Sequence, residues 1–229
     1  MRQRGRLAAA AVALAMLLAA CSPPPAPSIT LAKCPTAAPT PGEATAILAD
    51  AARAVVVTTK GSFTIELNAA AAPIATANFV ALARCGFYAQ ISFHRVLAGF
   101  IAQAGDPQTR SNHGDFPGLG KGGPGYQFEV ELPPASLAFD KYVVAMANAM
   151  QYDPVSGAIQ GGADTSGSQF FIDLESLVGR LRPYYAIFGK VVAGADVIDA
   201  IGAVRVNDPS LGLPLEPVII QSVTIESGG

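Results

Sequence analysis

The chain has 229 residues, of which 51% are hydrophobic and 14% are charged, and its formal net charge is −2 at pH 7. This near-neutral charge excludes a nucleic-acid-binding surface built on a basic patch. The two histidines (His94, His113) and three cysteines (Cys21, Cys34, Cys85) do not cluster at the spacing of metal ligands, so we expect a protein without a metal site.

Residues 1–20 have the composition of a lipoprotein signal peptide. Arg2, Arg4 and Arg6 precede an uninterrupted apolar run over residues 7–20, which is too short for a comfortable membrane span. Residues 18–22 read L-A-A-C-S and resemble the lipobox of bacterial lipoproteins, so we expect lipidation of Cys21. The alternative is an ordinary cleavage site with a cysteine nearby by chance. We expect an extracytoplasmic protein, lipid-anchored to a bacterial membrane.

Residues 21–52 lack the pattern of a folded element. Seven prolines lie between residues 22 and 42, interleaved with Ala, Ser and Thr. This composition favours an extended tether that holds a domain away from a membrane, and the alternative is a proline-rich ligand for a partner module. We expect the folded domain to cover residues 53–226.

Short β-rich runs dominate that domain, together with two helical patterns. Proline at 73 and glycine at 86 bracket a helix over residues 73–85, and a second helix is expected over 194–201. The glycine-rich segment 105–125 is expected to be a loop, because it lacks the spacing of a phosphate-binding motif. Strands are expected at 55–59, 62–67, 91–103, 142–146, 169–172, 186–188 and 218–226.

Four segments of the domain carry a family resemblance. They are F-H-R-V-L-A-G-F-I-A-Q-A-G-D at 93–106, M-A-N-A at 146–149, G-S-Q-F-F-I at 167–172 and F-G-K-V at 188–191. In this order they resemble the cyclophilin-type peptidyl-prolyl cis-trans isomerases, over nearly all of residues 53–226. The resemblance implies a mainly β fold, a closed eight-stranded antiparallel barrel capped by two α-helices.

The resemblance also implies the residues of the site. Arg95 is implied to be catalytic, and Gln103 to orient Arg95 and bind the peptide backbone. The implied substrate-binding residues are Phe100, Ile101, Phe171, Leu181 and Tyr185 around the proline ring, and Ala147, Asn148, Ala149 and Gln169 for the residues before the proline.

These residue types suit the isomerisation of an X-Pro bond. Amide resonance sets a rotation barrier of about 18–20 kcal/mol, and a guanidinium that hydrogen-bonds the prolyl nitrogen weakens that resonance. No bond is made or broken, so we expect no cofactor. The expected substrates are proline-containing segments of exported proteins, and the expected state is a monomer. The alternative from another class is a chaperone module that binds prolyl peptides with little or no turnover.

Some positions depart from the family's pattern. Tyr185 stands where many members carry a histidine, so we expect activity to be flat between about pH 6 and 8. The chain has no Trp, and Arg180 is the nearest candidate for the position where cyclosporin-sensitive members carry one, so weak sensitivity is expected. The segment 150–165 differs from the family's loop. His94 is expected to be structural, because the reaction transfers no proton.

Two further questions are left open by the sequence. Cys34 and Cys85 could form a disulfide in an oxidising compartment, or Cys85 could be a free buried residue. Phe170 and Phe171 alternate along a strand, so one should enter the core and the other the pocket. The resemblance assigns Phe171 to the pocket.

Overall fold

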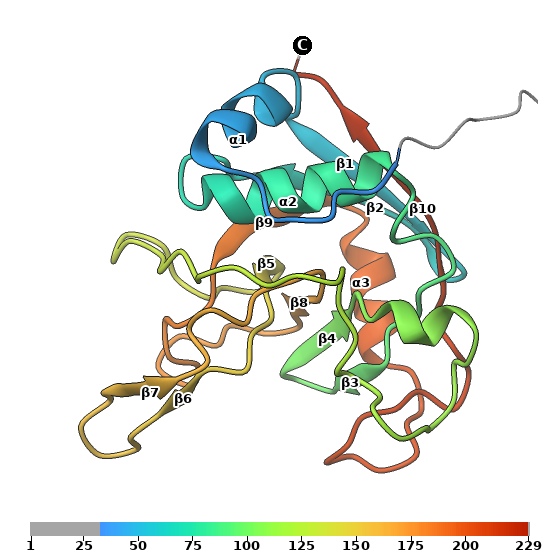
Figure 1. Cartoon of the computed structure of the whole chain (residues 1–229). Helices are drawn as coiled ribbons and strands as arrows, with labels where there is room; N and C mark the ends of the chain where they lie inside the picture. Colours follow the sequence, from blue (N-terminus) through green and yellow to red (C-terminus); the bar gives the residue numbers. More distant parts are fainter. Residues whose placement is uncertain (1–32, 229) are drawn as a thin grey trace, which may run out of the picture. The chain divides into compact units, whose positions relative to one another are not determined.

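The computed structural model describes residues 33–228, so the expected signal peptide, Cys21 and the first part of the expected tether lie outside the described residues. The architecture is mainly β, with an eight-stranded antiparallel sheet in the order β10-β1-β2-β9-β5-β8-β4-β3 (Figure 1). Its strands are β1 Arg53–Thr58, β2 Gly61–Leu67, β3 Arg95–Leu97, β4 Ile101–Ala104, β5 Val143–Met146, β8 Phe170–Asp173, β9 Ile187–Ala193 and β10 Ile220–Glu226. A separate hairpin consists of β6 Gln151–Tyr152 and β7 Ile159–Gly161.

Three α-helices accompany the sheet in this range, α1 Pro41–Leu48, α2 Pro73–Arg84 and α3 Ala195–Gly202, with a short 3-10 helix at Pro107–Arg110. Helix α2 packs on β9 and β10, α1 packs on α2, and α3 packs on β2, β3 and β4 (Figure 1). The carboxylate of Glu131 accepts hydrogen bonds from the backbone N–H groups of Ile74 (2.9 Å) and Ala75 (2.8 Å). A distant acidic residue therefore caps α2, whose own Ala72 supplies no side-chain cap.

The expectation of a closed barrel is wrong, because the sheet is an open, curled half-barrel. Strands β10 and β3 are its two edges. The chain that precedes β3 meets the start of β10 in an isolated bridge between Ser92 and Ile219, and the backbone N–H of Gln90 donates to the carbonyl of Ile220 (2.7 Å). The outer edge of β3 is occupied by a loop, since the backbone N–H of Val96 donates to the carbonyl of Gly212 (2.6 Å). This loop takes the place where β10 would close the barrel.

The expected strand over residues 91–103 is divided into two. A turn at residues 98–100 separates β3 from β4, and Gly99 adopts a positive φ of 67° there. The resulting hairpin pairs Arg95 directly with Gln103. The break therefore brings two of the expected site residues together.

The expectation of two helices omits α1, which lies inside the segment expected to be a tether. Thr40 caps this helix by accepting from the backbone N–H of Glu43 (3.4 Å), and the Glu43 carboxylate accepts from the backbone N–H of Thr40 (2.8 Å). This reciprocal capping box, followed by Pro41, favours a helix start over an extended chain. Arg84 of α2 forms an ion pair with Asp50 (2.6 Å), which holds the same segment against the domain.

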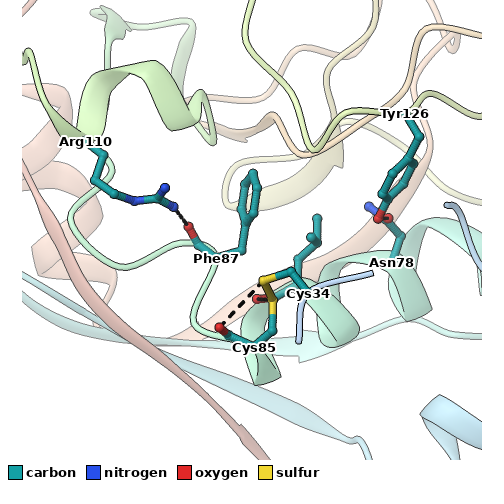
Figure 2. The surroundings of a disulfide bond; sticks show 7 residues. Cys34, Asn78, Cys85, Phe87, Arg110 and Tyr126 are labelled. Atoms are coloured by element: carbon teal, nitrogen blue, oxygen red, sulfur yellow. Dashed lines mark hydrogen bonds between the residues drawn. A yellow bond between two sulfur atoms is a disulfide. The ribbon is translucent and has the colours of Figure 1, made fainter. Parts of the chain in front are cut away.

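A disulfide joins this N-terminal segment to the end of α2 (Figure 2). Cys34 and Cys85 have their Cα atoms 5.1 Å apart and lie 51 residues apart in sequence. Of the two alternatives left open by the sequence, the structure therefore has the disulfide. The side chain of Arg110 donates to the carbonyl of Phe87 and its guanidinium carbon lies 5.6 Å from the centre of the Phe87 ring, which fixes the chain that follows Cys85.

Replacing Cys34 by serine should lower the free energy of unfolding by about 2–4 kcal/mol, because the crosslink closes a long loop in the unfolded chain. Denaturant unfolding with and without reductant measures the effect. The wild type should lose stability on reduction, and the Cys34→Ser variant should not respond. Identical wild-type midpoints in both conditions would contradict this expectation.

Candidate functional site

The register of the sheet places the expected polar and apolar site residues in one row. Arg95 on β3 pairs with Gln103 on β4, Gln103 with Phe171 on β8, and Phe171 with Ala145 on β5. Directly opposed residues project to the same face of a sheet. This row therefore faces away from the main core, which contains the neighbouring Phe170. Phe170 and Phe171 therefore enter two different apolar clusters, as their alternation along the strand predicts, and the substrate role of Phe171 stays a prediction.

A second apolar cluster, separate from the main core, lies on this face of the sheet, and we call it the apolar pocket after its expected role. Its buried base consists of Ile101, Phe139, Val143, Ala145, Phe171, Leu177 and Ile187, and Phe100, Leu137, Ala147, Leu181 and Tyr185 pack against it. The rings of Phe171 and Tyr185 are perpendicular, with centroids 5.2 Å apart. The structure thus brings together all five residues that were expected around a proline ring, Phe100, Ile101, Phe171, Leu181 and Tyr185.

Arg95 lies at the border of this pocket and is half-buried. Within residues 33–228, the structure shows neither an ion pair nor a hydrogen bond for its guanidinium, so the N–H groups are available to a bound peptide. Gln103 lies opposite Arg95, but its amide donates to the Gln169 side chain (2.9 Å) rather than contacting the guanidinium. Gln103 is therefore positioned by Gln169.

A groove of about 550 Å³ has Gln103 in its wall, and we call it the first groove. Ala147, Asn148, Ala149 and Gln169 line it, together with the glycine-rich segment 120–125. These four residues were expected to receive the part of the substrate before the proline. The Asn148 side chain donates to the carbonyl of Tyr184 (2.8 Å) and accepts from the backbone of Met150 (3.1 Å), so it also shapes the wall of the groove.

Sequence reasoning missed the residue that holds the glycine-rich wall in place. The buried carboxylate of Asp106 accepts from the backbone N–H groups of Gly120 (2.7 Å) and Gly122 (3.3 Å). A Cβ atom at Gly122 would lie 2.0 Å from a carboxylate oxygen of Asp106, so only glycine fits there. The amide of Gln169 donates to the carbonyls of the same two glycines (2.9 and 2.8 Å). The sequence contained one signal for this role, because Asp106 is the last residue of the segment 93–106 that carries the family resemblance.

Two departures from the family's pattern lie at the rim of the site. The guanidinium carbon of Arg180 is 5.9 Å from the centre of the Phe100 ring, and its Nη1 donates to the carbonyl of Gly99 (3.2 Å). The hairpin β6–β7, within the segment 150–165, projects from the body of the domain (Figure 1). Ala149 and Thr165, on either side of the hairpin in sequence, line the first groove.

The histidine and tyrosine of this region do not titrate near neutral pH. Burial lowers the pKa of His94 to about 4, since the charged imidazolium would lose its hydration. Burial raises the pKa of Tyr185 above its ordinary value. We expect kcat/KM for a prolyl peptide to be flat between pH 6 and 7.5, measured by exchange NMR at constant ionic strength. A clear inflection near pH 6.5 would contradict this assignment.

Over residues 33–228, no group of three His, Cys, Asp or Glu side chains is placed to hold a metal ion. Among the helices of the same range, none combines the length and apolar character needed to cross a bilayer.

Comparison with known proteins gives a consistent result. The family model described as cyclophilin type peptidyl-prolyl cis-trans isomerase/CLD matches residues 54–225. A peptidyl-prolyl cis-trans isomerase of Helicobacter pylori is 38% identical over 159 residues, covering 67% of this chain and 82% of that protein. Peptidyl-prolyl cis-trans isomerase B of Streptomyces anulatus is 36% identical over 197 residues, covering 79% and 99%.

Solved structures agree with the sequence matches. The crystal structure of a Cryptosporidium parvum cyclophilin type peptidyl-prolyl cis-trans isomerase aligns with a TM-score of 0.64 at 30% identity, covering 78% of this chain and 99% of that one. A second structure of the same protein, in the presence of the dipeptide Ala-Pro, aligns with a TM-score of 0.62.

Proposed function

Because the chain belongs to the cyclophilin-type peptidyl-prolyl cis-trans isomerases, we propose that it uses Arg95 and the adjoining apolar pocket to isomerise X-Pro bonds in exported proteins. The observation that carries the proposal is the row formed by Arg95, Gln103 and Phe171 across three strands. It places a guanidinium that has no partner within residues 33–228 on the same face as the apolar cluster expected to receive the proline ring.

The reaction follows from this juxtaposition. The apolar pocket holds the proline ring, and the first groove holds the preceding residues until the acyl group turns about the C–N bond. As the prolyl nitrogen becomes pyramidal, its lone pair accepts a hydrogen bond from Arg95, which stabilises the twisted state. An acceleration of about 10⁴-fold requires roughly 5–6 kcal/mol, which a charged donor, desolvation and positioning together can supply.

Two features support an extracytoplasmic, lipid-anchored location. Residues 1–22 combine a basic start, an apolar run and a cysteine at the lipobox position. The disulfide between Cys34 and Cys85 is typical of proteins in oxidising compartments. The substrates in that setting are proline-containing segments of other exported proteins, and the segment between Cys21 and Cys34 links the lipid to the domain.

Turnover is tested by exchange NMR on a short Ala-Pro peptide. Catalytic amounts of the protein should produce cis-trans exchange cross-peaks on a subsecond timescale, since the uncatalysed step takes tens of seconds. If the peptide resonances shift on binding but show no cis-trans exchange cross-peaks, the protein binds prolyl peptides with little turnover. That result would overturn the enzymatic proposal.

Anchoring is tested on the full chain expressed in a bacterium. We expect the wild type to partition into the detergent phase of Triton X-114, and the Cys21→Ala variant to partition into the aqueous phase or remain uncleaved. A Cys34→Ser variant is the matched control, because its thiol lies outside the lipobox and its partitioning should follow the wild type. Aqueous partitioning of the wild type would overturn the anchor.

A further inference from the structure

A second groove, of about 500 Å³, has Arg95 in its lining, and none of its lining residues belongs to the apolar pocket. It shares Arg95, Gln103 and Gly120 with the site already described. Its other walls come from residues 115–119 and from the loop at 207–213, which covers the outer edge of β3. A peptide bound at Arg95 therefore has the second groove next to the guanidinium, besides the first groove at Gln103.

The loop at 207–213 is a firm wall, because its own contacts fix it. The backbone N–H of Asn207 donates to the carbonyl of Leu213 (2.9 Å), and the Asn207 side chain accepts from the backbone N–H of Leu213 (3.2 Å). Gly212 has a φ of +80°, and a Cβ atom there would lie 2.7 Å from the carbonyl oxygen of Val96. The tip residue Leu211 remains 63% exposed while facing the groove.

The lining of the second groove combines apolar side chains with one unsatisfied polar group. Phe116, Leu119, Leu211 and Leu213 supply the apolar part. His94 lies at the base, only 4% exposed, and within the described chain neither ring nitrogen has a hydrogen-bond partner. Both ring nitrogens are closed to solvent, so the apolar side chains are the surface that a bound residue contacts.

We propose that the second groove binds the residue that follows the proline, with a preference for a large apolar side chain against Leu211. This inference rests on the proposed function, because it takes Arg95 as the point at which the substrate crosses the sheet. The proline ring fills the apolar pocket and the preceding residues fill the first groove. The second groove is then the remaining surface next to Arg95 that can receive the chain after the proline.

The test uses three peptides, Ace-Ala-Ala-Pro-Xaa-NH2, with Leu, Ser or Lys as Xaa. We expect the wild type to isomerise the Leu peptide with a kcat/KM about tenfold above that of the Ser peptide, since partial burial of a leucine is worth about this factor. The Leu211→Ser variant should reduce the ratio to about twofold. The Leu215→Ser variant is the matched control, because Leu215 is 54% exposed and lies on the same connection but outside the second groove.

The outcomes separate this inference from the proposed function. Equal rates for the Leu and Ser peptides overturn the inference alone, and so does a Leu preference that survives in Leu211→Ser. A preference for Lys overturns it in favour of recognition by Asp115, the acidic residue of the second groove. Absence of catalysis on all three peptides overturns the proposed function as well.

Discussion

Replacing Arg95 by alanine should lower kcat/KM for a prolyl peptide by about 100- to 1,000-fold. The guanidinium is half-buried beside an apolar surface and, within residues 33–228, has no internal partner, so its removal breaks no contact that holds the fold. A charged donor aimed at the transition state in such a site contributes about 3–4 kcal/mol. The loss should fall mainly on kcat, because the pocket and the first groove still bind the peptide.

The matched controls are Arg95→Lys and Arg205→Ala. Lysine keeps the charge but lacks the planar fork of donors, so an intermediate rate is expected. Arg205 is an exposed arginine outside both the apolar pocket and the first groove, and its replacement should leave the rate within twofold of the wild type. Exchange NMR at saturating peptide gives kcat for each variant, and thermal unfolding verifies the fold. An Arg95→Ala rate close to the wild-type rate would reassign catalysis to the pocket alone.

Local patterns were sufficient for the centre of the site. The alternation of Phe170 and Phe171 along one short strand predicted that the two rings point to opposite faces of the sheet, and they lie in two different apolar clusters. The helix bracketed by Pro73 and Gly86 also lies where expected. Both features depend only on residues close together in sequence. Side chains alternate between the two faces of a strand, and proline and glycine mark the two ends of a helix.

The open sheet could not be predicted in this way. Whether a barrel closes depends on which segment occupies the outer edge of β3, and that choice is made between residues more than 100 positions apart in sequence. The loop carrying Gly212 takes the edge through its bond with Val96, and no local pattern near either residue indicates it. The second groove exists for the same reason, since this loop forms one of its walls.

Helix α1 is a different case, because its signal was present in the sequence. Thr40 and Glu43 have the spacing of a capping box and Pro41 follows the cap, whereas the expectation of a tether rested on the proline-rich composition of the surrounding segment alone. Composition averages over the segment, whereas a helix start depends on three or four residues. The packing of α1 on α2 and the disulfide to Cys85 are tertiary features beyond either signal.

Asp173 introduces a pH dependence that the sequence did not suggest. This residue pairs with Ile101 of the apolar pocket, is fully buried, and within the described chain neither of its carboxylate oxygens has a hydrogen-bond partner. Burial, assisted by the nearby charge of Asp140, raises its pKa to about 8. The folded protein therefore keeps a proton on Asp173 at neutral pH, whereas the unfolded chain releases it above about pH 4.

The consequence is a loss of stability as the pH rises. Between about pH 4 and 8 the unfolded state of the wild type is favoured by ionisation of Asp173, and above pH 8 both states are ionised and the difference stays constant. An Asp173→Asn variant lacks this titration. The free energy of unfolding of the wild type, relative to Asp173→Asn, should fall by about 1.4 kcal/mol per pH unit between pH 5 and 7.

Urea unfolding at pH 5, 6 and 7 measures this slope, which is independent of any constant cost of burying the new amide. Asp196→Asn is the matched control, because Asp196 is exposed on α3 and its replacement should leave the slope of the wild type unchanged. Asp140→Asn should shift the window to lower pH, since it removes the charge that opposes ionisation of Asp173. Parallel curves for the wild type and Asp173→Asn would show that the carboxylate is ionised in the folded protein and that water or a rearranged side chain reaches it.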